Sequence, residues 1–181
     1  MKKEKLIKSV IKKNRKAQLE FYRTYFGFLM SVAYKYYKNQ EDAAAIVNTA
    51  FLKIFDNLDK YNFSSPIEPW MKRITVNHII DEFRKNKKHN ETFIDSINES
   101  YTELDNLNEI ETDIEDEVVL TILEQLPNAT KNVFCLYAID GYSHKEISEL
   151  LGISYETSKW HVKEARKKLK ELLSKHKTLI G

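Results

Sequence analysis

The chain contains few of the residues that cross-link or interrupt a fold. Its 181 residues include one Cys, three Pro and four Gly. A single cysteine excludes an internal disulfide, and the apolar surroundings of Cys135 in NVFCLYAI predict a buried thiol. No apolar run approaches the roughly 18 residues of a membrane span, and the basic N-terminus lacks the continuous apolar core of a secretory signal. These absences predict a cytoplasmic protein without membrane insertion.

Apolar residues are nevertheless abundant enough to build a core. Hydrophobic residues make up 42% of the chain and aromatic residues 12%. In the N-terminal half they recur at spacings of three and four, which places them on one face of a helix. A first stripe contains Phe21, Tyr25, Phe28, Leu29, Val32 and Tyr36, and a second contains Val47, Ala50, Phe51, Ile54 and Leu58. The sequence therefore predicts an all-α fold.

The net charge of +2 is the sum of strongly basic and strongly acidic segments of the chain. Residues 1–89 contain 19 Lys/Arg and 9 Asp/Glu, whereas residues 90–117 contain 11 Asp/Glu and no Lys/Arg. Residues 118–181 are again basic, with 10 Lys/Arg and 7 Asp/Glu. This pattern predicts two small helical domains that bind polyanions, 1–89 and 118–181, joined by an acidic flexible linker over 90–117.

Catalytic and metal-binding motifs are missing. The five histidines, at positions 78, 89, 144, 161 and 176, are too widely spaced for a local metal motif, and there is no Gly-rich phosphate loop. We interpret His89, His144 and His176 as surface or capping residues. We therefore expect that the chain is not an enzyme and that it binds neither a metal ion nor a cofactor.

In the middle of the first basic block, NFSSPIEPW interrupts the helical pattern with two prolines. Pro69 is a plausible first residue of the next helix, because proline loses no hydrogen bond at a helix start. Trp70 follows, and we expect it to pack in the core and not to stack on a ligand.

The last block contains the signals of two helices joined by a tight turn. Gly141 is well placed for the left-handed residue that ends one helix, and Ser143 with Glu146 forms a capping box at the start of the next. Gly152 ends that helix, and Ser154 is expected to cap the one after it. The spacing predicts a helix-turn-helix.

The final helix has one apolar stripe and one basic face. Val162, Ala165 and Leu169 form the stripe that faces the core. At about 100° per residue, the opposite face presents Glu156, Trp160, Lys163 and Lys167, flanked by Lys159 and Glu164. Such a helix can lie in the major groove of DNA, with its first turns at base edges and its later cations at phosphates. An exposed Trp160 favours this function, because a large aromatic ring is costly to leave in water.

Two segments of the chain resemble the extracytoplasmic-function (ECF) branch of the bacterial sigma-70 family. GYSHKEISELLGISYETSKWHVKEARKKLKELL is similar to region 4 of that family. PWMKRITVNHIIDEFRKNKK, with the helices before it, is similar to region 2. The acidic stretch falls at the family's variable linker.

The resemblance implies a transcription initiation factor that binds core RNA polymerase and promoter DNA in the cytoplasm. It places the region 4 residues at the −35 element, the region 2 residues at the −10 element, and a third group at the polymerase. The −35 residues are Glu156, Thr157, Lys159, Trp160, Lys163, Glu164 and Lys167. The −10 residues are Asn77, where the family's recognition loop begins, with Asp81, Arg84 and Lys85. The polymerase-docking residues are Glu41, Asp42, Val47 and Phe51.

Some positions depart from the family pattern. AAIVNT stands where the family commonly has acidic docking residues, Ser158 replaces a buried valine, and His161 replaces an arginine. TSKWH is also similar to the LuxR-type regulator domain, so the alternative function is a stand-alone DNA-binding regulator. An N-terminal receiver domain would contain alternating strands and helices, which residues 1–89 do not show. Whether an anti-sigma factor binds the chain stays open.

Overall fold

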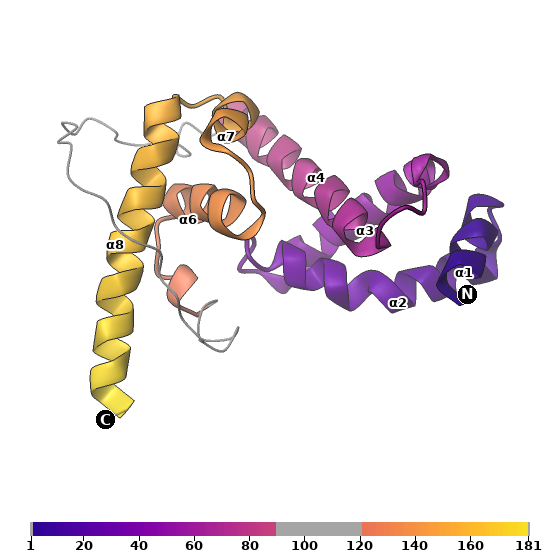
Figure 1. Ribbon diagram of the computed structural model, residues 1–181, viewed down its shortest axis with the longest axis horizontal. Helices are drawn as coiled ribbons and strands as arrows, with labels where there is room; N and C mark the ends of the chain where they lie inside the picture. The colour runs from indigo at the N-terminus through magenta and orange to yellow at the C-terminus, as the bar shows by residue number, and fades with distance from the viewer. Residues whose placement is uncertain (1, 90–120, 181) are drawn as a thin grey trace. The chain divides into compact units, whose positions relative to one another are not determined.

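The computed structural model describes residues 2–89 and 121–180, which are helical throughout apart from turns and loops. The chain divides into two compact units, Met1–Arg84 and Lys85–Gly181. The predicted acidic linker over 90–117 lies outside the described residues. The all-α fold predicted from the spacing of apolar residues is confirmed (Figure 1).

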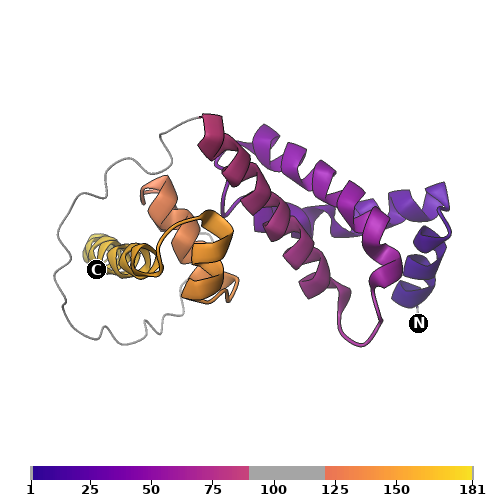
Figure 2. The same ribbon diagram turned by 90° about the horizontal axis from the view of Figure 1, so that it is seen from above.

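The first unit is built from four α-helices and one short 3-10 turn. These are α1 (Lys2–Ile11), α2 (Arg15–Ala33), α3 (Gln40–Asn57), η1 (Leu58–Lys60) and α4 (Ile67–His89). Asparagine side chains cap α2 and α3: the Asn14 and Asn39 amide oxygens accept hydrogen bonds from Ala17 N and Glu41 N, at 3.0 and 2.7 Å. The caps satisfy backbone donors that the first turn leaves free. Figure 2 shows the helices of this unit from above.

The core of this unit contains the two predicted stripes. Phe21, Leu29, Val47 and Ile54 are completely buried. The only member that remains half-buried is Phe28, which packs against the edge of the core. Aromatic rings meet there at contact distance, for example Phe21 and Tyr25 with centroids 4.7 Å apart. Such pairs stabilise a core beyond the area they bury.

Helix α4 differs from the expectation at two points. It begins at Ile67, so Pro69 lies within its first turn, where a missing N–H still costs nothing. It also continues through Asn77 to His89. The expectation that a recognition loop begins at Asn77 is therefore corrected. The physical reason is that Val76, Ile79 and Ile80 bury one face of the helix around that position. Trp70 is half-buried and packs against the edge of the core, with its ring centroid 5.6 Å from that of Tyr61, so the predicted core packing holds in part.

The second unit contains α6 (Asn128–Phe134), η3 (Cys135–Ile139), α7 (His144–Leu151) and α8 (Tyr155–Ile180). Both α6 and α7 pack on α8 (Figure 1). The predicted helix from Val118 is described only from residue 121, where Ile122, Leu123 and Leu126 are buried. Segment η3 is a π-helix, which the apolar spacing did not predict. Cys135 within it is a fully buried free thiol, as predicted.

The start of α7 and the turn between α7 and α8 have the predicted capping residues. Ser143 and Glu146 form a complete capping box, with Ser143 N donating to Glu146 Oε2 at 2.8 Å. Gly141 and Gly152 adopt left-handed backbone angles, φ 78° and 63°. Thr157 N donates to Ser154 Oγ at 2.9 Å, which caps α8. The helix-turn-helix is therefore defined by local residues at both helix starts.

Candidate nucleic-acid interface

Helix α8 separates an apolar seam from a basic surface. Val162, Ala165 and Leu169 are buried, as predicted. The exposed residues of the opposite side are Glu156, Lys159, Lys163 and Lys167. The seam fixes the helix on α6 and α7, so the lysines of the other face are presented to solvent in a row.

Three of the predicted contact residues are less exposed than expected. Trp160 is half-buried, and its ring meets the His161 ring edge-on with centroids 4.9 Å apart. The sequence predicted an exposed tryptophan, which the structure corrects. Glu164 is half-buried. Thr157 is half-buried too, and its hydroxyl lies 2.8 Å from Ser154 Oγ within the cap.

Lys159 is held in place by its neighbours on the helix. Its Nζ lies 3.5 Å from Glu156 Oε2 and 5.6 Å from the centre of the Tyr155 ring. An exposed ion pair of this kind contributes little stability. The two contacts place the ammonium group beside the Glu156 carboxylate and the Tyr155 ring.

Two polar residues that depart from the family pattern lie in the core of this unit, and each has a partner. Ser158 is fully buried, and its Oγ lies 3.0 Å from His144 Nδ1. His161 is also buried, and its Nδ1 lies 3.0 Å from Thr130 Oγ1. Paired groups avoid the cost of burying an unsatisfied polar atom.

The environment of both imidazoles favours the neutral form. Burial lowers the pKa of His161 to about 4. Burial, and then the charges of Lys159 and Arg166, lower the pKa of His144. His144, interpreted from the sequence as a surface or capping residue, is half-buried and pairs with the buried Ser158, so it also has a structural role. The side chains of His89 and His176 lie outside the described part of the chain.

On α4, the residues predicted to contact the −10 element share one side. Asn77, Asp81, Arg84 and Lys85 are all exposed and recur at helical spacing. Asp81 Oδ2 lies 3.3 Å from Lys53 Nζ of α3, in an exposed ion pair. This pair offsets part of the negative charge of Asp81.

The predicted polymerase-docking residues separate into two groups on α3. Glu41 and Asp42 are exposed in its first turn. Val47 and Phe51 are 0% and 2% exposed, because both belong to the core stripe. The prediction that either of them contacts the polymerase directly is therefore wrong. Leu52, which the sequence analysis missed, is 64% exposed. Helical spacing could have located it, because at about 100° per residue its side chain points away from the stripe.

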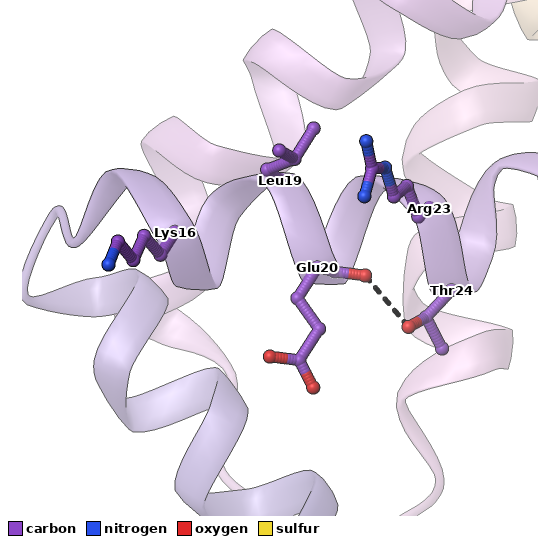
Figure 3. Close-up of a pocket in the computed structure, with 5 residues that line it drawn as sticks. All are labelled: Lys16, Leu19, Glu20, Arg23 and Thr24. Carbon is purple, nitrogen blue, oxygen red and sulfur yellow. Dashed lines mark hydrogen bonds between the residues drawn. The ribbon is translucent and has the colours of Figure 1, made fainter.

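A shallow hollow on α2 collects charged side chains near the N-terminus. It is lined by Lys16, Leu19, Glu20, Arg23 and Thr24 (Figure 3). Thr24 Oγ1 donates to Glu20 O at 2.8 Å, so the hydroxyl is held by the helix backbone.

Among the described residues, no group of His, Cys, Asp and Glu could hold a metal ion. None of the described helices combines the length and apolar composition needed to cross a membrane.

Comparison with known proteins assigns both units to one family. The family model for sigma-70 region 2 matches residues 21–89, and that for sigma-70 region 4 matches residues 116–169. RNA polymerase sigma factor SigZ of Bacillus subtilis is 35% identical over 130 residues, which are 71% of this chain and 70% of SigZ. ECF sigma factor SigW of the same organism is 28% identical over 94% of this chain and 96% of its own.

Among solved structures, the chain is similar to the sigma factor RpoE of Bartonella quintana, crystallised with the anti-sigma factor NepR. The identity is 19%, with 86% of this chain and 97% of that chain covered and a TM-score of 0.49.

The chain belongs to the sigma-70 family and is an RNA polymerase sigma factor of the ECF type. It is accordingly a factor for transcription initiation and not an enzyme. Helix α7 and the part of α8 up to residue 169 lie within the region 4 match, and α3 and α4 lie within the region 2 match. The alternative of a LuxR-type regulator does not explain the region 2 match.

Proposed function

We propose that the two units divide promoter recognition between them, with residues 1–89 and 118–181 as the working domains and 90–117 as the linker. In this scheme α8 enters the major groove of the −35 element. The first unit docks on core RNA polymerase and opens the −10 element. The factor would act in the cytoplasm, where the polymerase transcribes the chromosome.

The observation that carries the −35 assignment is the pair of faces on α8. The apolar seam is buried on α6 and α7 while Lys159, Lys163 and Lys167 stay exposed. Lys159 and Lys163, together with Glu156, Thr157, Trp160 and Glu164, occupy the N-terminal half, where a recognition helix meets base edges. Lys167 lies one turn further along and suits a phosphate.

The −10 assignment rests on the exposed side of α4. The Asn77 amide can donate and accept at once, which suits the edge of an unpaired base. Arg84 and Lys85 lie about two turns further along and supply positive charge for the strand backbone. Asp81 is neutralised in part by Lys53.

Polymerase docking is assigned to the exposed side of α3. Glu41 and Asp42 supply charge at its start, and Leu52 supplies an apolar contact in its last third. An exposed leucine is the type of residue that a partner surface can desolvate. Val47 and Phe51 contribute by holding the helix in the core.

The decisive experiment reconstitutes the chain with core RNA polymerase and sequences the 5′ ends of the transcripts. A defined set of start sites that is absent with core polymerase alone supports the proposal. A matched variant in which Lys163 is replaced by Ala should change the upstream sequence shared by those sites. Unchanged polymerase specificity on addition of the wild-type chain would refute the proposed function.

A further inference from the structure

Three rings from three helical segments form a stack beside the start of α8. The His144 ring is nearly parallel to the Tyr137 ring, with centroids 4.2 Å apart and planes at 13°. The His144 ring also meets the Tyr155 ring edge-on, with centroids 5.8 Å apart and planes at 78°. Tyr137 belongs to η3, His144 is the first residue of α7 and Tyr155 is the first residue of α8. In this ring stack a single imidazole therefore connects three elements.

Each outer ring of the stack lies under a cation of α8. Lys159 Nζ is 5.6 Å from the centre of the Tyr155 ring, and Arg166 Cζ is 5.8 Å from the centre of the Tyr137 ring. Cations are attracted to the face of an aromatic ring at such distances. The ring stack thus restrains two basic side chains of the proposed recognition helix, seven residues apart on the same side of it.

A hydrogen bond joins the same imidazole directly to α8. His144 Nδ1 lies 3.0 Å from Ser158 Oγ, and Ser158 is fully buried. The bond crosses from the first residue of α7 to the first turn of α8, so it spans the Gly152 turn. A buried hydroxyl that loses its partner carries a desolvation cost, so this bond favours the observed arrangement of the two helices.

We propose that His144 is a specificity-determining positioning residue for DNA recognition. Through the ring stack and the Ser158 hydrogen bond, it fixes the directions of Lys159 and Arg166 relative to the DNA without contacting the DNA itself. This inference rests on the proposed function of α8. The charged groups facing the imidazole are Lys159, Arg166 and Glu156, all from α8. A proton on His144 would add a third positive charge beside the first two, so the device requires the neutral ring.

The competing explanation is that His144 only stabilises the helix pair. Stability alone would weaken binding to every DNA sequence by the same factor. A positioning residue changes the preference among sequences, and only at the base pairs that the positioned side chain contacts. The two explanations therefore differ in base preference, even where overall affinity falls in both.

The experiment uses holoenzyme reconstituted with core RNA polymerase and duplex DNA randomised across the upstream promoter element. Sequencing the bound fraction gives the base preference at each position. The variants are His144→Ala, Lys159→Ala and the double variant. Ile147→Val is the control, because it trims a fully buried residue of α7 outside the ring stack.

We expect His144→Ala to reduce the preference about fivefold or more at the same positions as Lys159→Ala, the factor that losing one base contact produces. In the Lys159→Ala background, the additional effect at those positions should vanish. Ile147→Val should lower thermal stability with base preferences unchanged. A uniform loss of affinity in His144→Ala, with every preference retained, would overturn the proposal.

Two further variants cover the case in which His144→Ala does not fold. His144→Phe keeps an aromatic ring in the stack but removes the bond to Ser158, and Ser158→Ala removes that bond alone. Each should cause a partial loss of preference at the Lys159 positions, and wild-type preferences in both would refute the inference. If the wild-type holoenzyme itself shows no base preference, the proposed function of α8 fails, which is a distinct result.

Discussion

Acidification should destabilise the second unit through His161. The imidazole is buried, with its Nδ1 3.0 Å from Thr130 Oγ1, and burial lowers the pKa to about 4 from an ordinary value of 6.5. Between these values the unfolded chain binds a proton that the folded chain excludes. The stabilisation is therefore complete above pH 6.5 and is lost as the pH falls toward 4.

The size of the effect follows from the two pKa values. At 1.36 kcal/mol per pKa unit, excluding the proton amounts to about 3 kcal/mol once the pH is well below 4. At pH 5 the loss should be about 2 kcal/mol relative to pH 7.5. A domain of this size has a total stability of roughly 5–15 kcal/mol, so a loss of this magnitude is measurable by denaturant titration.

The assay exploits the position of Trp160, whose ring lies 4.9 Å from that of His161. The chain has two tryptophans, so a Trp70→Phe background leaves Trp160 as the only indole reporter. Urea unfolding followed by its fluorescence at pH 7.5 and pH 5 gives the loss of stability. The control is His161→Asn, which keeps a polar partner for Thr130 but does not titrate.

The difference between the two proteins isolates His161, because His144 titrates in both of them. We expect the wild-type background to lose about 2 kcal/mol more than His161→Asn over this pH range. Equal losses in the two proteins would show that His161 is solvated in the native state, and the argument from burial would be refuted.

Four other substitutions test the proposed surfaces. Lys163→Ala should reduce discrimination at the upstream element by about 1–3 kcal/mol, whereas Lys167→Ala should weaken binding equally across sequences, both measured by holoenzyme titration at fixed salt. Asn77→Ala should impair open-complex formation in a folded protein, and normal thymine reactivity to permanganate would contradict its role. Leu52→Ser should weaken core polymerase binding by about 1–2 kcal/mol, measured by fluorescence anisotropy. Leu19→Ser is the matched control, because Leu19 is also an exposed leucine but lies on α2.

The helix-turn-helix could be predicted because its signals are local. A capping box, two left-handed glycines and a serine cap each act within a few residues, and all lie where the sequence indicated. The apolar seam of α8 was predictable for a similar reason, since helical periodicity converts spacing directly into direction. Where only neighbours along the chain determine a feature, the sequence is sufficient.

Features that depend on packing were missed. Trp160 was expected to be exposed because its helical direction is outward, yet it is half-buried and its ring contacts the His161 ring edge-on. Leu52 adjoins a core stripe but points away from it, and Val47 and Phe51 are absorbed by the core. In each case the helical face was known, but the surface that covers it was not.

The buried polar residues show most clearly what apolar periodicity cannot detect. Ser158 and His161 stand where the family has other residues, and each forms a hydrogen bond with a residue distant in sequence, Ser158 with His144 and His161 with Thr130. Taken singly, a serine in place of valine predicts a cavity with an unsatisfied hydroxyl, which is destabilising. Taken with its partner, it predicts a polar contact that ties two helices together. Because each departure is offset by a residue 14 or 31 positions away, the pair is the unit that the fold tolerates. It follows that transplanting Ser158 or His161 alone into a relative should destabilise its region 4. Transplanting Ser158 together with His144, or His161 together with Thr130, should not.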